Sequence, residues 1–149
     1  MSALPDLTDV RTRTSPGFDI PYVLCVDDDP GGLALCKASL MRAGFAVHAV
    51  STGWEALKRL NEQPYDVVLL DLLMPSLHGR TVLSLIQQSH PEVVSRLIVM
   101  TGLSDNAIGD LYGKVGGILR KPLKIDSLID FVREFAASAS DHKATTRKP

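Results

Sequence analysis

Short, unbroken apolar runs alternate in this chain with segments whose apolar residues recur every three or four positions. The runs are Tyr22–Val26, Phe45–Val50, Val67–Leu70, Leu97–Met100 and Gly117–Leu119. Unbroken apolar character is typical of strands that are covered on both faces. Strands that alternate with helices predict repeated βα units and a parallel sheet. We therefore expect an α/β domain built on one open, doubly wound, five-stranded parallel sheet.

Helical spacing between the runs predicts the connecting helices. Thr52 and Glu55 match a capping box and mark the start of a helix. Gly109 and Gly113 each cost about 1 kcal/mol relative to Ala inside a helix, so we expect a weak helix there. The apolar positions of the other helices are Leu33, Cys36, Leu40 and Met41; Val82, Leu85 and Ile86; Ile108, Leu111, Tyr112 and Val115; and Ile125, Leu128, Ile129, Val132, Phe135 and Ala136.

Charge and length limit the function classes that need consideration. The 149 residues carry 16 Lys and Arg against 17 Asp and Glu, a formal net charge of −1. This balance provides no global basic field that would attract nucleic acid or an anionic membrane. No apolar run approaches the roughly 18–20 residues of a spanning helix, and the N-terminus lacks the features of a signal peptide. We expect a cytoplasmic protein that binds neither nucleic acid nor membrane.

Composition along the chain predicts three parts. Residues 1–19 lack apolar periodicity and are expected to be a flexible N-terminal segment, residues 20–137 one domain, and residues 138–149 a polar tail. At this length we expect no further attached domain beside it. Cys25 and Cys36 lie among apolar neighbours and are expected to be small buried hydrophobes that stay reduced, without a disulfide.

The histidines and aromatic residues suggest no separate site. His48, His78 and His90 are expected to be solvated loop residues, because no second His lies at ligand spacing. Trp54 and Tyr65 are expected to pack rather than to stack on bases, since no basic groove accompanies them.

Polar residues follow four of the expected strands, at the edge where ligands collect in such sheets. They are Asp27 and Asp28, Asp71, Thr101, and Lys121. Each alone has a structural explanation, such as helix capping, but the four ends together point to a site. Carboxylates brought together repel one another, and Mg²⁺ with oxygen ligands offsets that repulsion while it accepts phosphate oxygens. A carboxylate can also act as a nucleophile that forms an aspartyl-phosphate.

This ordered set resembles the receiver domains of bacterial two-component response regulators, the chemotaxis regulator being a small example. The resemblance covers about Tyr22 to Ala137 and rests on Asp27-Asp28, the run from Tyr65 through Asp71 to Pro75 with Gly79, Thr101-Gly102, and Lys121-Pro122. It implies a flavodoxin-like sheet with strand order 2-1-3-4-5 and helices on both faces.

The resemblance also implies roles for the residues. Asp71 would accept the phosphoryl group. Asp27, Asp28, Asp71 and the backbone carbonyl of Leu73 would hold Mg²⁺. Thr101 would hydrogen-bond the phosphoryl group and Lys121 would pair with it, so that Asp71, Thr101 and Lys121 form the catalytic set. The donor would be a sensor histidine kinase or a histidine phosphotransfer protein. Weak pairing of two copies through the fourth and fifth helices is a further expectation from the family.

The sequence departs from the family pattern at the switch. Ile118 stands where the family usually has Tyr or Phe, whose rotation is coupled to that of the threonine at position 101. Positions 73 and 103, which in the family influence how water reaches the phosphoryl group, are both Leu. Because both side chains are apolar, we expect the phosphoryl group on Asp71 to hydrolyse slowly.

Three functions remain open at this point. The first is a stand-alone switch that accepts a phosphoryl group and is not a turnover enzyme. It would act by binding an unknown protein target, by relaying the phosphoryl group onward or by serving as a phosphate sink, and the sequence does not choose among these. The second is a phosphorylation-independent adaptor with the same fold, favoured by Ile118 and by the glycines between Thr101 and Lys121. The third is an Mg²⁺-dependent phosphatase, which would usually have a second carboxylate two residues after its nucleophile, where this chain has Leu73.

Overall fold

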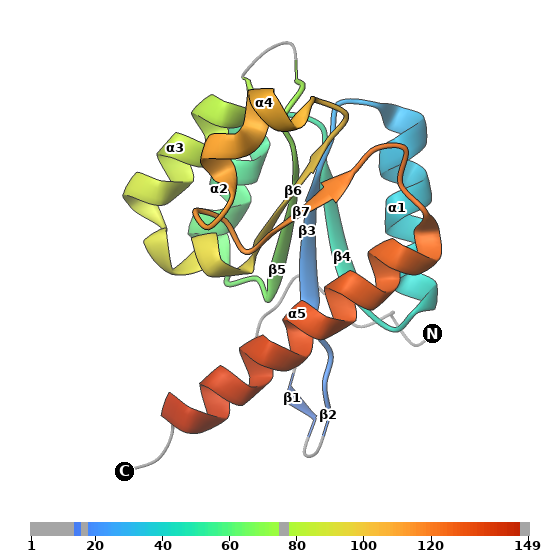
Figure 1. Ribbon diagram of the computed structural model, residues 1–149. Helices are drawn as coiled ribbons and strands as arrows, with labels where there is room; N and C mark the ends of the chain where they lie inside the picture. The colour runs from blue at the N-terminus through green and yellow to red at the C-terminus, as the bar shows by residue number, and fades with distance from the viewer. Residues whose placement is uncertain (1–13, 16–17, 75–77, 147–149) are drawn as a thin grey trace.

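The computed structural model describes residues 14–15, 18–74 and 78–146. A single parallel sheet forms its centre, and the strands follow one another across the sheet in the order β4-β3-β5-β6-β7 (Figure 1). This is the order 2-1-3-4-5 in sequence, so the prediction of a doubly wound, flavodoxin-like fold is confirmed. The strands are β3 (Tyr22–Val26), β4 (Ala46–Val50), β5 (Val67–Asp71), β6 (Leu97–Thr101) and β7 (Gly117–Arg120).

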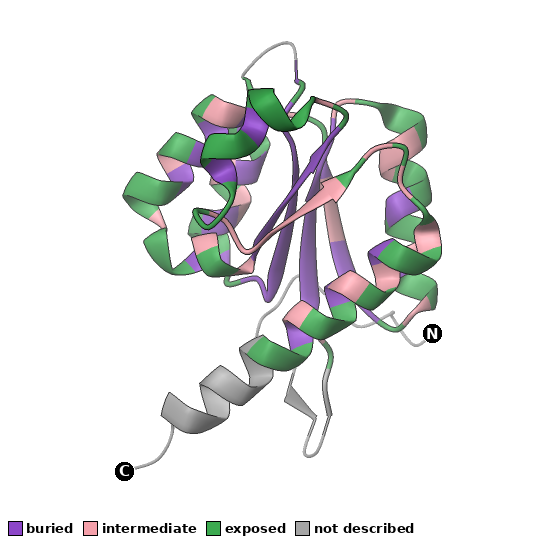
Figure 2. Ribbon diagram, viewed as in Figure 1, coloured by how far each residue is buried: buried purple, intermediate pink, exposed green. Residues whose placement is uncertain are grey.

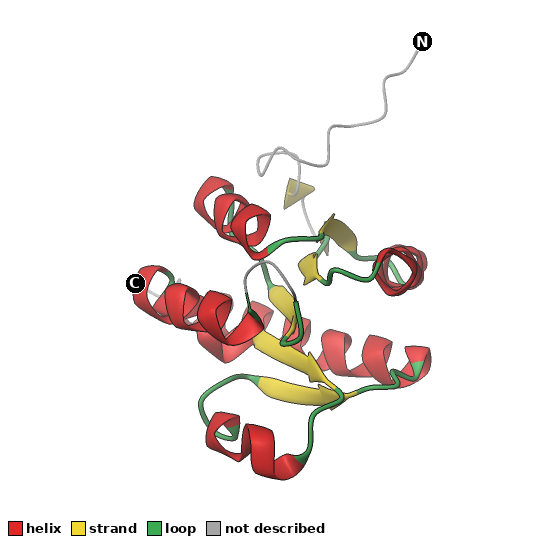
Figure 3. Ribbon diagram, turned by 90° about the horizontal axis from the view of Figure 1, so that it is seen from above, coloured by secondary structure: helices red, strands yellow, loops and turns green. Residues whose placement is uncertain are grey.

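Helices cover both faces of the sheet (Figure 3). Helices α2, α3 and α4 pack on one face, and α1 and α5 pack on the other. Residues of β1 (Thr14–Ser15) and β2 (Phe18–Asp19) form a separate antiparallel pair before the sheet. The helices are α1 (Pro30–Arg42), α2 (Gly53–Glu62), α3 (Gly79–Ser89), α4 (Asp105–Ile108) and α5 (Ile125–Thr146), with 3₁₀ turns η2 (Pro91–Arg96) and η3 (Gly109–Leu111).

The alternation of side chains along the strands produces two apolar cores. Tyr22 and Leu24 of β3 face α2 and α3, whereas Val23 and Cys25 face α1 and α5. The three middle strands β3, β5 and β6 are buried along their whole length (Figure 2). Burial on both faces explains why these strands carry unbroken apolar runs.

Side-chain caps fix the starts of two helices. Asp29 accepts a hydrogen bond from the Gly32 backbone N–H at 3.2 Å and caps α1. Thr52 accepts one from the Glu55 backbone N–H, also at 3.2 Å, and caps α2 as predicted. Each cap satisfies a backbone donor that the first helical turn leaves unpaired.

The helix predicted over Ile108–Val115 is wrong in extent. Helix α4 has four residues, and a 3₁₀ turn of three residues follows it. Ile108 and Leu111 are buried as expected, but Tyr112 is exposed. Gly113 has a φ of +81°, outside the helical region, so the helix cannot continue through it. The four-residue length of α4 agrees with the expectation of a weak helix, whose stability stays a prediction.

Four single-residue predictions need correction. Met41 and Trp54 are exposed, Trp54 to 63%, so neither packs into the core. His48 is no loop residue: it lies in β4, and its Nδ1 is 2.6 Å from the Tyr65 hydroxyl. His90 is half-buried, with its Nε2 2.8 Å from Asn61 Oδ1. Tyr65 is buried and His78 is exposed, both as predicted.

The predicted bounds of the domain fall near the ends of the described chain. Helix α5 continues through Thr146, so most of the predicted tail has a helical backbone, and Figure 1 shows this end of α5 projecting beyond the sheet. Residues 1–13 and 147–149 lie outside the described part. Within the described part, no helix combines the length and the apolar character that crossing a bilayer requires.

Candidate functional site

The polar residues that follow the strands meet at one edge of the sheet. Asp27 follows β3, Asp71 and Thr101 end β5 and β6, and Lys121 follows β7. The pairing aligns Asp71 with Met100 on the next strand, and the Lys121 N–H donates to the Thr101 carbonyl at 2.9 Å. Parallel pairing therefore brings residues nearly 100 positions apart to a common edge.

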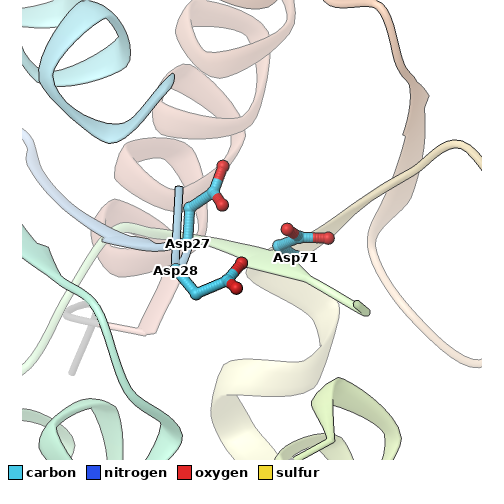
Figure 4. Close-up of side chains that lie close together, drawn as sticks. All are labelled: Asp27, Asp28 and Asp71. Carbon is cyan, nitrogen blue, oxygen red and sulfur yellow. The ribbon is translucent and has the colours of Figure 1, made fainter. Parts of the chain in front are cut away.

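Three carboxylates form a compact cluster there. Asp27, Asp28 and Asp71 each place an oxygen within 4.8 Å of the others, and Figure 4 shows them on neighbouring strand ends. Asp27 and Asp71 are only 6% and 3% exposed, and Asp28 is more exposed. A like-charged pair about 4 Å apart at an effective dielectric of 20 costs on the order of 4 kcal/mol. Oxygen donors so close together fit a hard divalent cation such as Mg²⁺.

Lys121 supplies a positive charge in contact with the cluster. Its Nζ lies 3.1 Å from Asp71 Oδ2 and 3.4 Å from Asp27 Oδ2, so it bridges the two buried carboxylates. Burial lowers the pKa of Lys121, but the hydrogen bonds and charges of Asp71 and Asp27 outweigh burial and hold this pKa above its ordinary value. Lys121 therefore stays protonated at neutral pH. The Lys121–Pro122 peptide bond is cis.

Burial raises the pKa of Asp71 above its ordinary value, although the Leu73 N–H and Lys121 oppose the rise. The Leu73 N–H donates to Asp71 Oδ1 at 3.0 Å, while Lys121 occupies Oδ2. The same arrangement fixes Asp27, whose Oδ1 accepts from the Asp29 N–H at 3.0 Å. Backbone donors thus hold both carboxylates in place with their second oxygens turned to Lys121.

Thr101 and Ile118, the predicted switch residues, lie on neighbouring strands. Thr101 is fully buried, and its Oγ1 accepts a hydrogen bond from the Leu103 N–H at 3.0 Å. The hydroxyl keeps its own hydrogen to donate. Ile118 is half-buried against the core that contains Ile108. Leu73 has an exposed side chain, 55% accessible.

Two arginines that the sequence reasoning missed hold the segment around α4. Arg80 of α3 donates to both carboxylate oxygens of Asp110, at 3.0 and 3.2 Å, and to the Ala107 carbonyl. Arg120 of β7 pairs with Asp105 and donates to the Leu103 carbonyl. We call these contacts the arginine clasps. The partners in these contacts are 15 to 30 residues apart in the sequence, so no local sequence pattern predicts them.

The sequence model of the response regulator receiver domain matches residues 23–133. The chain belongs to the response regulator receiver domain family. The match spans β3 to α5 and so includes every strand end that carries the acidic cluster and Lys121. Receiver domains of this family take part in two-component phosphorelay signalling.

Relatives of the receiver domain are longer proteins. It is 36% identical over 129 residues to the transcription factor SKN7 of Saccharomyces cerevisiae, covering 85% of this chain and 20% of SKN7. It is 30% identical over 155 residues to the sensor histidine kinase GacS of Pseudomonas protegens, covering 97% of this chain and 17% of GacS. The chain therefore spans about a fifth of the length of these two relatives.

Solved structures share the fold. The receiver domain of the Francisella response regulator 1452 is 29% identical, with a TM-score of 0.71 over 79% of this chain and 98% of that one. The receiver domain of a sensor histidine kinase from Pseudomonas aeruginosa, solved with a magnesium ion in its active-site cleft, is 23% identical. Its TM-score is 0.71, over 79% of this chain and 98% of that one. At 23% identity, the similarity to this structure shows a shared fold only.

Proposed function

We propose that Asp71 of this receiver domain accepts a phosphoryl group and so acts as a signalling switch. The observation that carries the proposal is the bridge from Lys121 Nζ to Asp71 and Asp27 inside a cluster of three carboxylates. A cluster of this kind is suited to receive a phosphoryl group, because it combines a nucleophile, a fixed cation and oxygen donors for a metal.

The step transfers a phosphoryl group from an oxygen or nitrogen atom of the donor to a carboxylate oxygen of Asp71. A carboxylate oxygen of Asp71 forms a bond to phosphorus while the bond between phosphorus and the donor atom breaks, and the donor leaves with that electron pair. Lys121 hydrogen-bonds the phosphoryl oxygens, and Thr101 donates its hydroxyl hydrogen to them. Asp27, Asp28, Asp71 and the Leu73 carbonyl would hold Mg²⁺, which supplies charge neutralisation for the carboxylates and the phosphoryl oxygens when bound.

Phosphorylation gives Thr101 a new acceptor. If its hydroxyl turns toward the phosphoryl group, the hydrogen bond from the Leu103 N–H is disturbed, and the Leu103 carbonyl is held by Arg120. This connection links the site to the segment around α4 without the aromatic residue that Ile118 replaces. Slow self-hydrolysis, expected from Leu73 and Leu103, stays a prediction.

The relatives support a histidine as the donor. GacS is a sensor histidine kinase, which makes a kinase or a histidine phosphotransfer protein the natural source of the phosphoryl group. We propose that the domain is a phosphoacceptor and not a turnover enzyme, and that it acts on a protein target. The cytoplasmic location, the lack of nucleic-acid and membrane partners, weak pairing of two copies and the action as a stand-alone switch stay predictions.

The test is the intact mass of the protein after incubation with Mg²⁺ and acetyl phosphate or phosphoramidate, whose phosphorus is bonded to nitrogen as in phosphohistidine. The expected result is one labile phosphoryl adduct that requires Mg²⁺ and is absent from Asp71→Asn. Asp126→Asn, at the exposed start of α5, is the matched control and keeps the adduct.

An adduct that persists in Asp71→Asn would refute the assignment of the phosphoacceptor. Failure of both donors to react with a protein that binds Mg²⁺ would favour the adaptor, whose partner binding is independent of phosphorylation. The four-residue α4 and Ile118 are the observations that keep this second function in view.

A further inference from the structure

The two cysteines of the chain lie side by side. Cys25 is in β3 and Cys36 is in the middle of α1, and their sulfur atoms are 3.6 Å apart. Both thiols are free, and they are 0% and 6% exposed. Burial agrees with the prediction from sequence. The further prediction, that the two thiols stay reduced, does not follow from burial alone, because the two sulfur atoms are in contact. Their contact does not follow from sequence, because the docking of α1 on the sheet creates it.

A cavity gives small molecules a route to this pair. Cys25 and Cys36 line a cavity of about 210 Å³ whose wall also includes Met100. Exposed Leu35 and Asp29 are part of the same wall, so the cavity opens to solvent. A water molecule takes up about 30 Å³ of liquid, and a hydroperoxide as small as hydrogen peroxide therefore fits without unfolding of the domain.

We propose that Cys25 and Cys36 are a modification site that a hydroperoxide oxidises to a reversible intramolecular disulfide in the folded protein. The sulfurs of a disulfide are about 2.05 Å apart, so the two atoms need to approach each other by only about 1.5 Å. Small changes of the side-chain torsions, together with a slight shift of surface helix α1, supply that movement. The proposal does not rest on phosphorylation of Asp71.

The reaction balances with the hydroperoxide as the oxidant. Cys36, the more exposed thiol, takes one peroxide oxygen as the O–O bond breaks, which gives a sulfenic acid and one water. The sulfur of Cys25 then displaces the hydroxyl group, the S–S bond forms, and a second water leaves. Two electrons pass from the two thiols to one peroxide, and an added dithiol returns them.

The test uses the full chain, first reduced and then exposed to hydrogen peroxide, with circular dichroism to confirm that it stays folded. The reaction is stopped with catalase, free thiols are alkylated in denaturant, and the intact mass is measured. A tryptic peptide of residues 14–37 contains both cysteines and no internal Lys or Arg, so it reports on the pair alone. The expected peptide has lost two hydrogens and takes up no alkyl group. After treatment with dithiothreitol it takes up two.

A parallel sample in urea and the variant Cys36→Ala are the controls. Cys36 sits on a helix where Ala is well tolerated, and the variant is expected to show no loss of two hydrogens. Three results would overturn the proposal. The first is that both thiols of the folded protein can still be alkylated after a peroxide exposure that oxidises the protein unfolded in urea. The others are a disulfide-linked dimer and a product that has only gained oxygen. The wild-type peptide decides among them even if the variant fails to fold.

Discussion

Gly79, the first residue of α3, packs so closely on the segment after β5 that an added methyl group would collide with backbone. A Cβ at this position would lie 2.4 Å from Leu72 Cα and 2.5 Å from the Asp71 carbonyl oxygen. Backbone atoms cannot rotate away, so either α3 or the segment that carries Asp71 must shift. The Gly79 N–H also donates to the Leu72 carbonyl at 3.1 Å, a hydrogen bond that the shift would strain.

We expect Gly79→Ala to lower the free energy of unfolding by about 3 kcal/mol. Overpacking of a dense interior costs roughly 1–3 kcal/mol, and two close backbone contacts put this site at the upper end. A weakened hydrogen bond adds about 1 kcal/mol, and the better helix propensity of Ala returns up to about 1 kcal/mol. For a domain of this size the change corresponds to a melting temperature lower by about 6–12 °C.

Urea unfolding followed by circular dichroism measures this change, with Gly109→Ala as the matched control. Gly109 has helical backbone angles, and a Cβ there would meet no atom within 4 Å. The control should therefore be neutral or more stable by up to about 1 kcal/mol. A Gly79→Ala protein within about 0.5 kcal/mol of wild type, the usual range for surface substitutions, would refute the reasoning.

Three further predictions use the same assay. Asp71→Asn raises the free energy of unfolding by roughly 1 kcal/mol at pH 7 without divalent cations, since it removes a like charge from the cluster. Because the pKa of Asp71 is raised in the folded state, the wild type loses stability as the pH rises from the ordinary value of 3.8 through that folded pKa. The stability that Asp71→Asn gains over the wild type should therefore shrink toward pH 4. A gain that does not change with pH would contradict this explanation. Mg²⁺ at 100 times its Kd stabilises the wild type by about 2.7 kcal/mol, and Asp28→Asn should weaken this stabilisation. Equal stabilisation of both proteins would disprove a role of Asp28 in binding Mg²⁺. Thr52→Ala removes the cap of α2 and costs about 1 kcal/mol, whereas Ser51→Ala beside it should cost little; equal losses would argue against the cap.

The sequence predicted the sheet well, because strands buried on both faces need apolar residues at every position. The observed strands β5, β6 and β7 each extend one residue further than predicted, to Asp71, Thr101 and Arg120. Backbone pairing continues there although the side chains are polar, since the hydrogen bonds of a sheet do not depend on side-chain polarity. These additional residues belong to the edge that carries the site.

Helix spacing was a poorer guide where the apolar residues were few. The pattern Ile108, Leu111, Tyr112 and Val115 fits a helix, but Tyr112 has extended backbone angles (φ −61°, ψ 127°) and Gly113 has a positive φ, so no helix reaches Val115. The clasps formed by Arg80 and Arg120 then hold the segment instead of helical hydrogen bonds.

The acidic cluster and Lys121 could be predicted because each residue lies at or just after the carboxyl end of a strand, and parallel strands end at one edge. Contacts made in the middle of elements could not. The approach of Cys25 to Cys36 and of His48 to Tyr65 depends on how α1 and the segment before β5 dock on the sheet, which side-chain packing decides and local sequence does not.

The arginine clasps make the surface around α4 respond to ionic strength. The side chains of both ion pairs are between 40% and 79% exposed, and mobile ions screen exposed charges over a Debye length of about 8 Å at 0.15 M. The sheet beneath is held by buried side chains and backbone hydrogen bonds, which such screening barely affects. Partners that bind residues 103–112 will therefore meet a more ordered surface in dilute buffer than in concentrated salt.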